Sequence, residues 1–185
     1  MTELPLQSAR LVLRDFTSED WEDVHEWGAD PEVSRYEAWG PNTVDDTRAF
    51  VERVLVATAL RPRTEYTLLA ALHETGRAIG AGVLYLRSGE NRAGEIGYIL
   101  KRDWWGQGFG TEMARTLLEF GFERFGLHRI YATCDPRNAR SARILQKIGM
   151  VHEGRRREDL LIRDSWRDSD LYAILESEWR SLRQT

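Results

Sequence analysis

The amino-acid sequence predicts an α/β protein in which a mixed, largely antiparallel sheet is flanked by helices. Three strand-like segments follow one another at 66–72, 78–86 and 95–100, separated by turn signals at glycines, which predicts an antiparallel meander. A strongly amphipathic helix at 110–125 and a short strand at 129–134 come next. The last meander strand and this later strand are therefore expected to form a parallel pair joined through a helix.

Length and composition favour a single domain over residues 1–185. Hydrophobic residues make up 42% of the chain and charged residues 30%, a balance typical of a globular protein. The formal charge of −4 provides no overall field that would gather nucleic acid or anionic lipid. We therefore expect neither a nucleic-acid partner nor a membrane partner.

Cysteine and histidine usage argues against disulfide and metal chemistry. Cys134 is the only cysteine, so no intrachain disulfide or cysteine-rich zinc site is expected. The four histidines have no spacing suited to metal ligation. The N-terminus resembles no signal peptide, and the longest apolar stretches have only the length of a strand. These features predict a cytoplasmic protein.

The first elements read as strand, turn and helix. Apolar residues alternate from Leu11 to Phe16, and the polar cluster 17–20 supplies helix-capping side chains. A helix is therefore expected at about 20–27.

A second helix start is predicted at 30–32, where Asp and Pro stand before Glu. Tyr36 and Trp39 follow in a loop that ends at Gly-Pro, and a helix with an acidic first turn is expected from 43 to about 60.

The second half of the chain contains the clearest helix. Apolar residues recur at helical spacing throughout 110–125, and Gly126 ends the pattern. Another helix is expected at 139–148, capped by Asn138, followed by closing strands at 150–158 and 169–175.

A glycine-rich turn precedes the strongest helix. Gly106, Gly108 and Gly110 allow backbone N–H groups to approach a ligand, and the helix N-terminus adds a positive dipole. This combination suits phosphate, although a tight turn needed only for packing would look the same. The spacing GxGxG differs from the dinucleotide fingerprint GxGxxG, and the Lys-Ser/Thr ending of a P-loop is missing, so NAD and ATP are disfavoured.

The context of this turn resembles one known family. The stretch from Glu95 through Trp105-Gly106-Gln107-Gly108-Phe109-Gly110-Thr111-Glu112 resembles the acetyl-CoA motif of the GNAT acetyltransferases, and 138–150 resembles their second motif. The opening 10–14 and the closing strands look most like the RimJ/RimL-like branch, so the resemblance covers nearly the whole chain. Trp105 stands where the wider family usually has Arg or Gln.

The resemblance implies the GNAT fold, with a splayed parallel strand pair, and acetyl-CoA as co-substrate. The N–H groups from Gly106 to Thr111 would hold the pyrophosphate, while the strand at Ile99 and Leu100 would pair with the pantetheine. Asn138 would hold the pantetheine arm, act as a simple helix cap, or do both. The implied cofactor-binding residues are Ile99, Leu100, Trp105, Gly106, Gln107, Gly108, Phe109, Gly110, Thr111, Asn138 and Ser141.

Acetyl transfer to an amine requires a neutral amine. With reference pKa values of about 7.8 and 10.4, deprotonation at pH 7 costs roughly 1 kcal/mol for an α-amine and roughly 4.6 kcal/mol for lysine. Glu95 is the candidate general base, although a strand-end carboxylate facing solvent or an arginine would have the same sequence.

The other catalytic needs are an oxyanion donor and a proton for the leaving thiolate. A backbone N–H near Ile99 is the expected oxyanion donor, and Ser141 is the candidate proton donor. The tyrosine that many GNAT enzymes place near 142–145 is missing here, so Ser141 or water must serve. Cys134 is interpreted as a small buried hydrophobe.

The acceptor site is the least specified part of the sequence. Tyr36 and Trp39, with acidic residues such as Glu32 and Glu37 and the turn at 164–166, would suit an ammonium-bearing substrate, although ordinary packing explains them equally well. Glu95 would also face this substrate.

The leading hypothesis is an N-acetyltransferase that acts on a primary amine, either a protein N-terminal α-amine or a small molecule, by direct attack in a ternary complex. The alternative is a non-catalytic acyl-CoA-binding sensor or interaction module of the same fold. A longer acyl donor and a homodimer are both compatible with the sequence.

Overall fold

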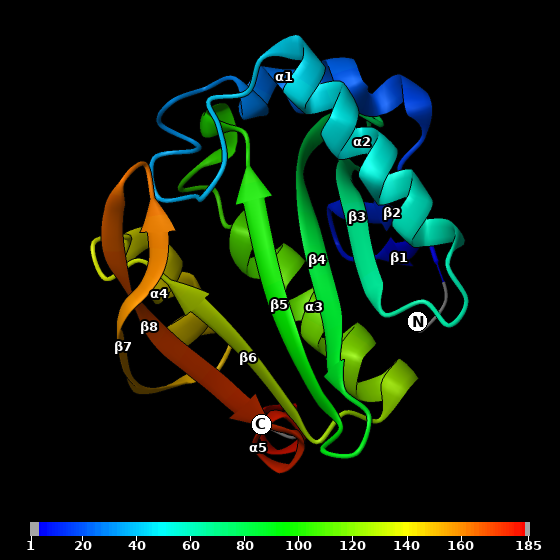
Figure 1. Ribbon diagram of the computed structural model, residues 1–185. Helices are drawn as coiled ribbons and strands as arrows, with labels where there is room; N and C mark the ends of the chain where they lie inside the picture. The colour runs from blue at the N-terminus through cyan, green and yellow to red at the C-terminus, as the bar shows by residue number, and fades with distance from the viewer. Residues whose placement is uncertain (1–3, 184–185) are drawn as a thin grey trace.

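In the computed structural model, which describes residues 4–183, eight strands form one sheet and five α-helices surround it (Figure 1). The strands are β1 (Leu6–Gln7), β2 (Leu11–Arg14), β3 (Glu65–Leu72), β4 (Ala78–Ser88), β5 (Ala93–Leu100), β6 (Arg129–Cys134), β7 (Val151–Ile162) and β8 (Ser165–Leu175). The helices are η1 (Ser18–Asp20), α1 (Trp21–Gly28), α2 (Val44–Ala59), η2 (Arg102–Trp104), α3 (Phe109–Phe125), α4 (Ala139–Lys147) and α5 (Glu176–Leu182), where η marks 3₁₀ turns.

The sheet order is β1-β2-β3-β4-β5-β6-β8-β7, and every neighbouring pair is antiparallel except β5 and β6. These two strands run parallel and are connected through α3, as the sequence predicts. They pair only over Ala93↔Arg129, Gly94↔Ile130 and Glu95↔Tyr131. Beyond Glu95 the two strands diverge and leave a wedge-shaped gap in the middle of the sheet (Figure 1).

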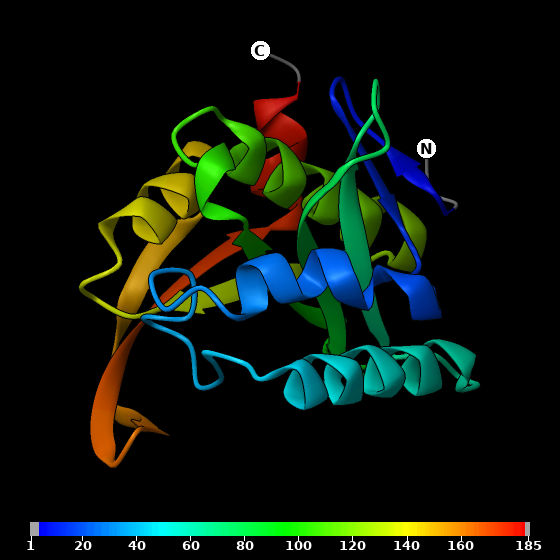
Figure 2. The ribbon, with the colours of Figure 1, turned by 90° about the horizontal axis from the view of Figure 1, so that it is seen from above.

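Helices cover both faces of the sheet. In the view from above, α1 and α2 lie on one side and α3, α4 and α5 on the other (Figure 2). Successive strand side chains point to opposite faces, so Leu68 packs into the core under α3, whereas its neighbour Leu69 packs under α1 and α2. The amphipathic helices predicted from the sequence thus find an apolar sheet face on each side.

Strands β4 and β5 approach each other closely because β4 carries a glycine. A Cβ atom added at Gly80 would lie 2.1 Å from the backbone oxygen of Ile99. The glycine is therefore required for this register, which aligns Gly80 with Leu100.

Local predictions failed in three places. The helix predicted to start at 30–32 is wrong: Asp30 accepts a hydrogen bond from the Glu32 N–H through its side chain, and the chain continues as turns. The closing strands are longer than predicted because β7 and β8 form one extended hairpin. Strand β1 and helix α5 were not predicted.

No helix within residues 4–183 is long and apolar enough to cross a membrane.

Candidate active site

The glycine-rich turn lies at the N-terminus of α3, as predicted. Gly106 and Gly108 have φ angles of 76° and 89°, and Gly108 forms the N-cap position of the helix. These angles are readily adopted only by glycine. A Cβ at Gly106 would meet nothing within 4 Å, so glycine is needed there for its positive φ angle and not for lack of space. The space above the turn is open. The first N–H groups of α3 have no intrahelical partner and favour an anion.

Arg10, the residue before β2, braces this turn. Its guanidinium donates a hydrogen bond to the backbone oxygen of Gln107 at 3.1 Å and lies 4.0 Å from the ring centroid of Phe109. Glu112 accepts hydrogen bonds from the Ser8 hydroxyl, at 2.8 Å, and from the Arg10 backbone, at 2.7 Å. Burial would raise the pKa of Glu112, but these hydrogen bonds and the Arg10 charge outweigh it and hold that pKa below its usual value.

Trp105 ties the turn to the end of β5 and to α4. Its indole Nε1 donates to the backbone oxygen of Leu100 at 2.9 Å, and the Arg140 guanidinium lies 4.7 Å from its ring centroid. The Trp105 side chain therefore helps to fix the position of the turn relative to β5 and α4.

The wedge between β5 and β6 exposes backbone groups in the middle of the sheet. The Lys101 N–H donates to the backbone oxygen of Ile79, on β4. Along an antiparallel strand, backbone groups point alternately to the two sides, so Ile99, two residues before Lys101, also directs its N–H and C=O toward β4. Tyr98 and Leu100 consequently direct theirs into the gap. Of the two residues expected to pair with the pantetheine, Leu100 directs its backbone groups into the gap, whereas Ile99 directs its own toward β4.

A tyrosine and a serine meet beside this gap. The Tyr98 hydroxyl lies 3.0 Å from the Ser141 hydroxyl and donates to the Ser141 backbone oxygen at 3.3 Å. Asn138 caps α4, because its side-chain oxygen accepts from the Ser141 N–H at 3.1 Å. Burial raises the pKa of Tyr98 far above its ordinary value, and the hydrogen bond from Ser141 offsets only part of that shift. The phenol is therefore protonated and uncharged at neutral pH.

Sequence reasoning missed Tyr98, because the search for a tyrosine was confined to the segment 142–145. The signal was present: Tyr98 lies two residues before Leu100 in the predicted strand and thus shares its face. Cys134 ends the neighbouring strand, and burial together with Asp170 and Asp135 raises the pKa of its thiol to about 11. The thiol is therefore protonated at neutral pH and is a poor nucleophile.

Glu95 lies apart from the Tyr98–Ser141 pair. It occupies the last paired position of β5, at the closed end of the gap, and its side chain points to the opposite face from Tyr98. Its carboxylate accepts a hydrogen bond from Arg87 at 2.8 Å. The structure thus does not bring Glu95 and Ser141 together on one face.

The predicted acceptor residues lie in the loop between α1 and α2. The Arg137 guanidinium, from the segment before α4, lies 5.8 Å from the Tyr36 ring centroid, so this loop borders the β6–α4 connection. Trp39 is 38% exposed.

The side-chain carboxylate of Glu37, in the same loop, has no hydrogen bond or ion pair with any residue in the described part of the chain. Burial raises the pKa of Glu37, and its charge helps to raise the pKa of Tyr98. An unpaired carboxylate therefore acts electrostatically on the phenol beside the gap.

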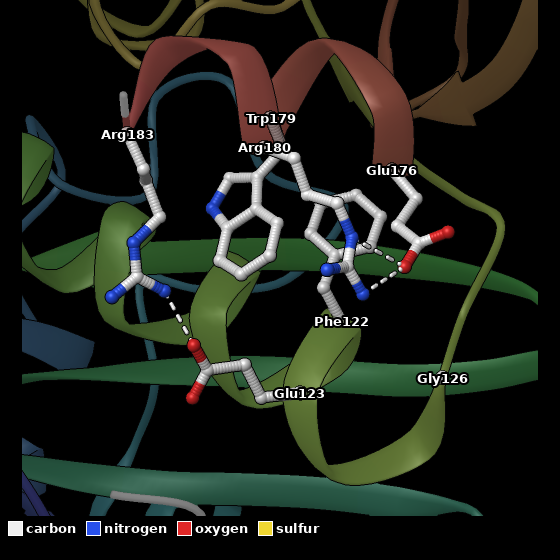
Figure 3. Close-up of a pocket in the computed structure, with 7 residues that line it drawn as sticks. All are labelled: Phe122, Glu123, Gly126, Glu176, Trp179, Arg180 and Arg183. Atoms are coloured by element: carbon white, nitrogen blue, oxygen red, sulfur yellow. Dashed lines mark hydrogen bonds and ion pairs between the residues drawn. The ribbon is translucent and has the colours of Figure 1, made fainter. Parts of the chain in front are cut away.

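A separate hollow of about 530 Å³ lies at the other end of α3, against α5 (Figure 3). Its charged side chains already form pairs: Arg183 with Glu123, and Arg180 with Glu176 at 2.7 Å. Trp179 stacks on Phe122 with a centroid separation of 5.0 Å. None of the residues that line this hollow belongs to the glycine-rich turn, which lies at the opposite end of α3. Among residues 4–183, no three His, Cys, Asp or Glu side chains gather in a way that could hold a metal ion.

The turn and the gap together suit a ligand that joins a phosphate to an amide-bearing chain, as acyl-CoA does, which makes the site that of an acyl-CoA-dependent transferase. The family model for the acetyltransferase (GNAT) domain matches residues 10–151. The chain therefore belongs to the GNAT acetyltransferase family.

Individual relatives agree with this assignment. The N-acetyltransferase YnaD of Bacillus subtilis (strain 168) is 35% identical over 174 residues, which cover 94% of this chain and 98% of YnaD. A crystal structure of a GNAT-family acetyltransferase from Bacillus anthracis superimposes with a TM-score of 0.83 at 34% identity, covering 94% of this chain and 99% of the other.

The [ribosomal protein uS5]-alanine N-acetyltransferase of Escherichia coli (strain K12) is 32% identical over 84 residues, covering 45% of this chain and 43% of that enzyme. The predicted GNAT fold and the resemblance to the RimJ/RimL-like branch are confirmed. The protein is an acetyltransferase.

Proposed function

We propose that this protein transfers the acetyl group of acetyl-CoA to a primary amine by direct attack within a ternary complex. The observation that carries the proposal is the wedge between β5 and β6, which opens beside a glycine-rich helix N-terminus. The turn offers N–H groups to a pyrophosphate, and the free strand edge offers hydrogen-bonding groups to the amides of a pantetheine arm.

The residues present fit acetyl-CoA. The backbone from Gly106 to Thr111 would receive the pyrophosphate, and the gap-facing backbone groups of Tyr98, with the Leu100 N–H, would pair with the pantetheine, since the Leu100 oxygen already accepts from Trp105. The side-chain oxygen of Asn138 is occupied by its capping bond, so its amide NH₂ is the part that remains for a ligand. Capping and ligand contact thus use different atoms of one residue.

Proton transfer on the thiol side is assigned to the Tyr98–Ser141 pair. When the amine attacks the thioester carbonyl, the tetrahedral intermediate collapses by breaking the carbon–sulfur bond, and the thiolate must gain a proton or a hydrogen bond. The phenol of Tyr98 supplies it, and Ser141 orients the phenol through the 3.0 Å contact. A gap-facing backbone N–H of β5 would stabilise the oxyanion.

Two carboxylates compete for the role of general base. Glu95 lies at the closed end of the gap, and its carboxylate is already engaged by Arg87 at 2.8 Å. Glu37 has no such partner, and its raised pKa brings it closer to the pH at which a base works best. These observations favour Glu37, and the pair Glu37→Gln and Glu95→Gln decides between them: the variant that loses turnover without losing acetyl-CoA affinity identifies the base.

The acceptor we favour is an α-amine. Its deprotonation at pH 7 costs roughly 1 kcal/mol, against roughly 4.6 kcal/mol for a lysine side chain. A single partly buried carboxylate is therefore a strong enough base to remove the proton of an α-amine. The relative from Escherichia coli is named for acetylation of an alanine of a ribosomal protein. A small-molecule amine of similar basicity meets the same chemical requirement.

The first test is acetyl-CoA-dependent thiol release with a panel of N-terminal peptides, amino acids, polyamines and aminoglycosides. We expect one class to support turnover, and Gly108→Asp to abolish it because a carboxylate at the helix N-terminus repels the pyrophosphate. Silence across the panel, with acetyl-CoA still bound, would contradict the proposal and favour an acyl-CoA-binding module. Repeating the assay with succinyl-CoA establishes whether the donor is acetyl or longer.

A further inference from the structure

The tip of the β7–β8 hairpin reaches the loop between α1 and α2 (Figure 1). The hairpin turns through Arg163 and Asp164, which both have positive φ angles, 47° and 61°, a geometry that matches a tight two-residue turn. Most of β7 is exposed, yet Ile162, next to the turn, is only 2% exposed. At the tip, Ile162 is therefore packed against the protein, whereas residues 163–166 and most of β7 are exposed to solvent.

Arg163 links this tip to the α1–α2 loop through backbone oxygens. Its Nη2 donates to Gly40 at 2.6 Å and to Ser34 at 3.2 Å, with a longer contact to Trp39 at 3.4 Å. One guanidinium thus holds two points of the loop that are six residues apart. Hydrogen bonds from a charged donor are stronger than those between neutral groups.

One of these oxygens also fixes the backbone of Glu37. The Ser34 backbone oxygen accepts from the Glu37 N–H at 3.0 Å as well as from Arg163. Ser34 itself is fully buried, and the loop is closed at its base by the Asn42 N–H donating to the Gly28 oxygen at 2.9 Å. Arg163 therefore braces the turn that carries Glu37, and the same loop reaches the β6–α4 connection through the contact of Tyr36 with Arg137.

We propose that Arg163 is a positioning residue for the acceptor half of the active site, in that it holds the α1–α2 loop so that Glu37 faces the gap between β5 and β6. This inference rests on the proposed function. It assigns the hairpin tip to the acceptor side and gives it no part in holding acetyl-CoA, because the hydrogen bonds of the Arg163 guanidinium go to the α1–α2 loop, whereas the glycine turn is braced by Arg10 and Trp105.

The chain supplies a matched control. Arg157 lies on the same hairpin, is exposed, and makes no contact with the α1–α2 loop among the described residues. Arg163→Ala keeps a Cβ at the positive φ angle, so the strain of the turn is unchanged and only the guanidinium is lost. Arg163→Lys keeps the charge but replaces the planar guanidinium with a shorter side chain that ends in an ammonium group.

The first measurement is amide hydrogen exchange of Glu37 and Asn42 in the whole protein, which needs no substrate. We expect Arg163→Ala to speed their exchange by about tenfold or more, Arg163→Lys to restore part of the protection, and Arg157→Ala to leave it unchanged. Unchanged exchange in Arg163→Ala, or equal acceleration in Arg157→Ala, would overturn the inference.

The second measurement separates the two substrates. With the acceptor found in the panel, Arg163→Ala should lower kcat/KM for the amine by about tenfold, while the Kd for acetyl-CoA from calorimetry stays within about twofold of wild type. A parallel loss of acetyl-CoA affinity would refute an acceptor-side role. If the wild-type protein turned over no amine, the proposed function would fail while the exchange result still decided whether Arg163 holds the loop.

Discussion

Replacing Tyr98 with phenylalanine removes one hydroxyl from the edge of the gap and leaves the ring in place. The structure gives that hydroxyl two contacts, 3.0 Å to the Ser141 hydroxyl and 3.3 Å to the Ser141 backbone oxygen. A net value of about 1 kcal/mol per hydrogen bond predicts a loss of about 1 to 2 kcal/mol in the free energy of unfolding. For a chain of this size this corresponds to about 2 to 8 °C in Tm.

The catalytic expectation is much larger than the structural one. A positioned proton donor contributes about 10² to 10⁴ in rate, so kcat should fall by at least about 100-fold in Tyr98→Phe, with the Kd for acetyl-CoA little changed. Ser141→Ala, which leaves the phenol but removes its orienting partner, should lose less. Tyr66→Phe is the control, because Tyr66 packs in the aromatic cluster with Phe120 and Phe125, away from the gap.

Steady-state kinetics with thermal unfolding on the same samples test this reasoning. If Tyr98→Phe lost the expected stability but retained kcat within about threefold, the phenol would be a packing residue and the assignment of the proton donor would be refuted. If kcat and acetyl-CoA affinity fell together, the loss would reflect a deformed cofactor site.

Three further predictions follow from contacts described above. Gly80→Ala should cost about 3 kcal/mol or more in urea unfolding, because its Cβ would collide with the Ile99 backbone oxygen; a cost below about 1 kcal/mol would contradict this. If Glu37 is the base, kcat/KM should fall as pH drops through its raised pKa, above the ordinary value of about 4.3, and Glu37→Gln should lack that limb. The Glu112 pKa is lowered on folding, so its stabilisation is present above the ordinary carboxyl pKa and lost as pH falls through the depressed value. The stability gap between wild type and Glu112→Gln should therefore narrow between about pH 7 and pH 3, as measured by urea unfolding.

The sequence was most informative where structure depends on near neighbours. Helix α3 was predicted to within one residue because its apolar stripe, the glycines before it and Gly126 after it are all local signals. The parallel pair followed from the order strand, helix, strand, since the crossover requires a helix of that length. The glycine turn was placed correctly for the same reason.

Features that depend on distant partners were not predictable in this way. Tyr98 and Ser141 are 43 positions apart, and their contact depends on how α4 packs against β5. Arg163 lies more than 120 positions from the loop it holds. Strand β7 was cut short because it is exposed on both faces along most of its length, so the alternation that marks a half-buried strand is missing. Asp30 misled the helix prediction because its side chain satisfies a local backbone donor.

The divergence of β5 and β6 after three residue pairs places an unpaired strand edge inside a sheet. Unpaired edges at the border of a sheet invite pairing with other chains and promote aggregation. This edge instead faces β6 inside the sheet, while the other edge of β5 is paired with β4, so a slender molecule with amide groups fits it better than another polypeptide strand does. Under the proposed function, the hydrogen-bonding groups of this free edge serve the co-substrate, at a position shielded from self-association.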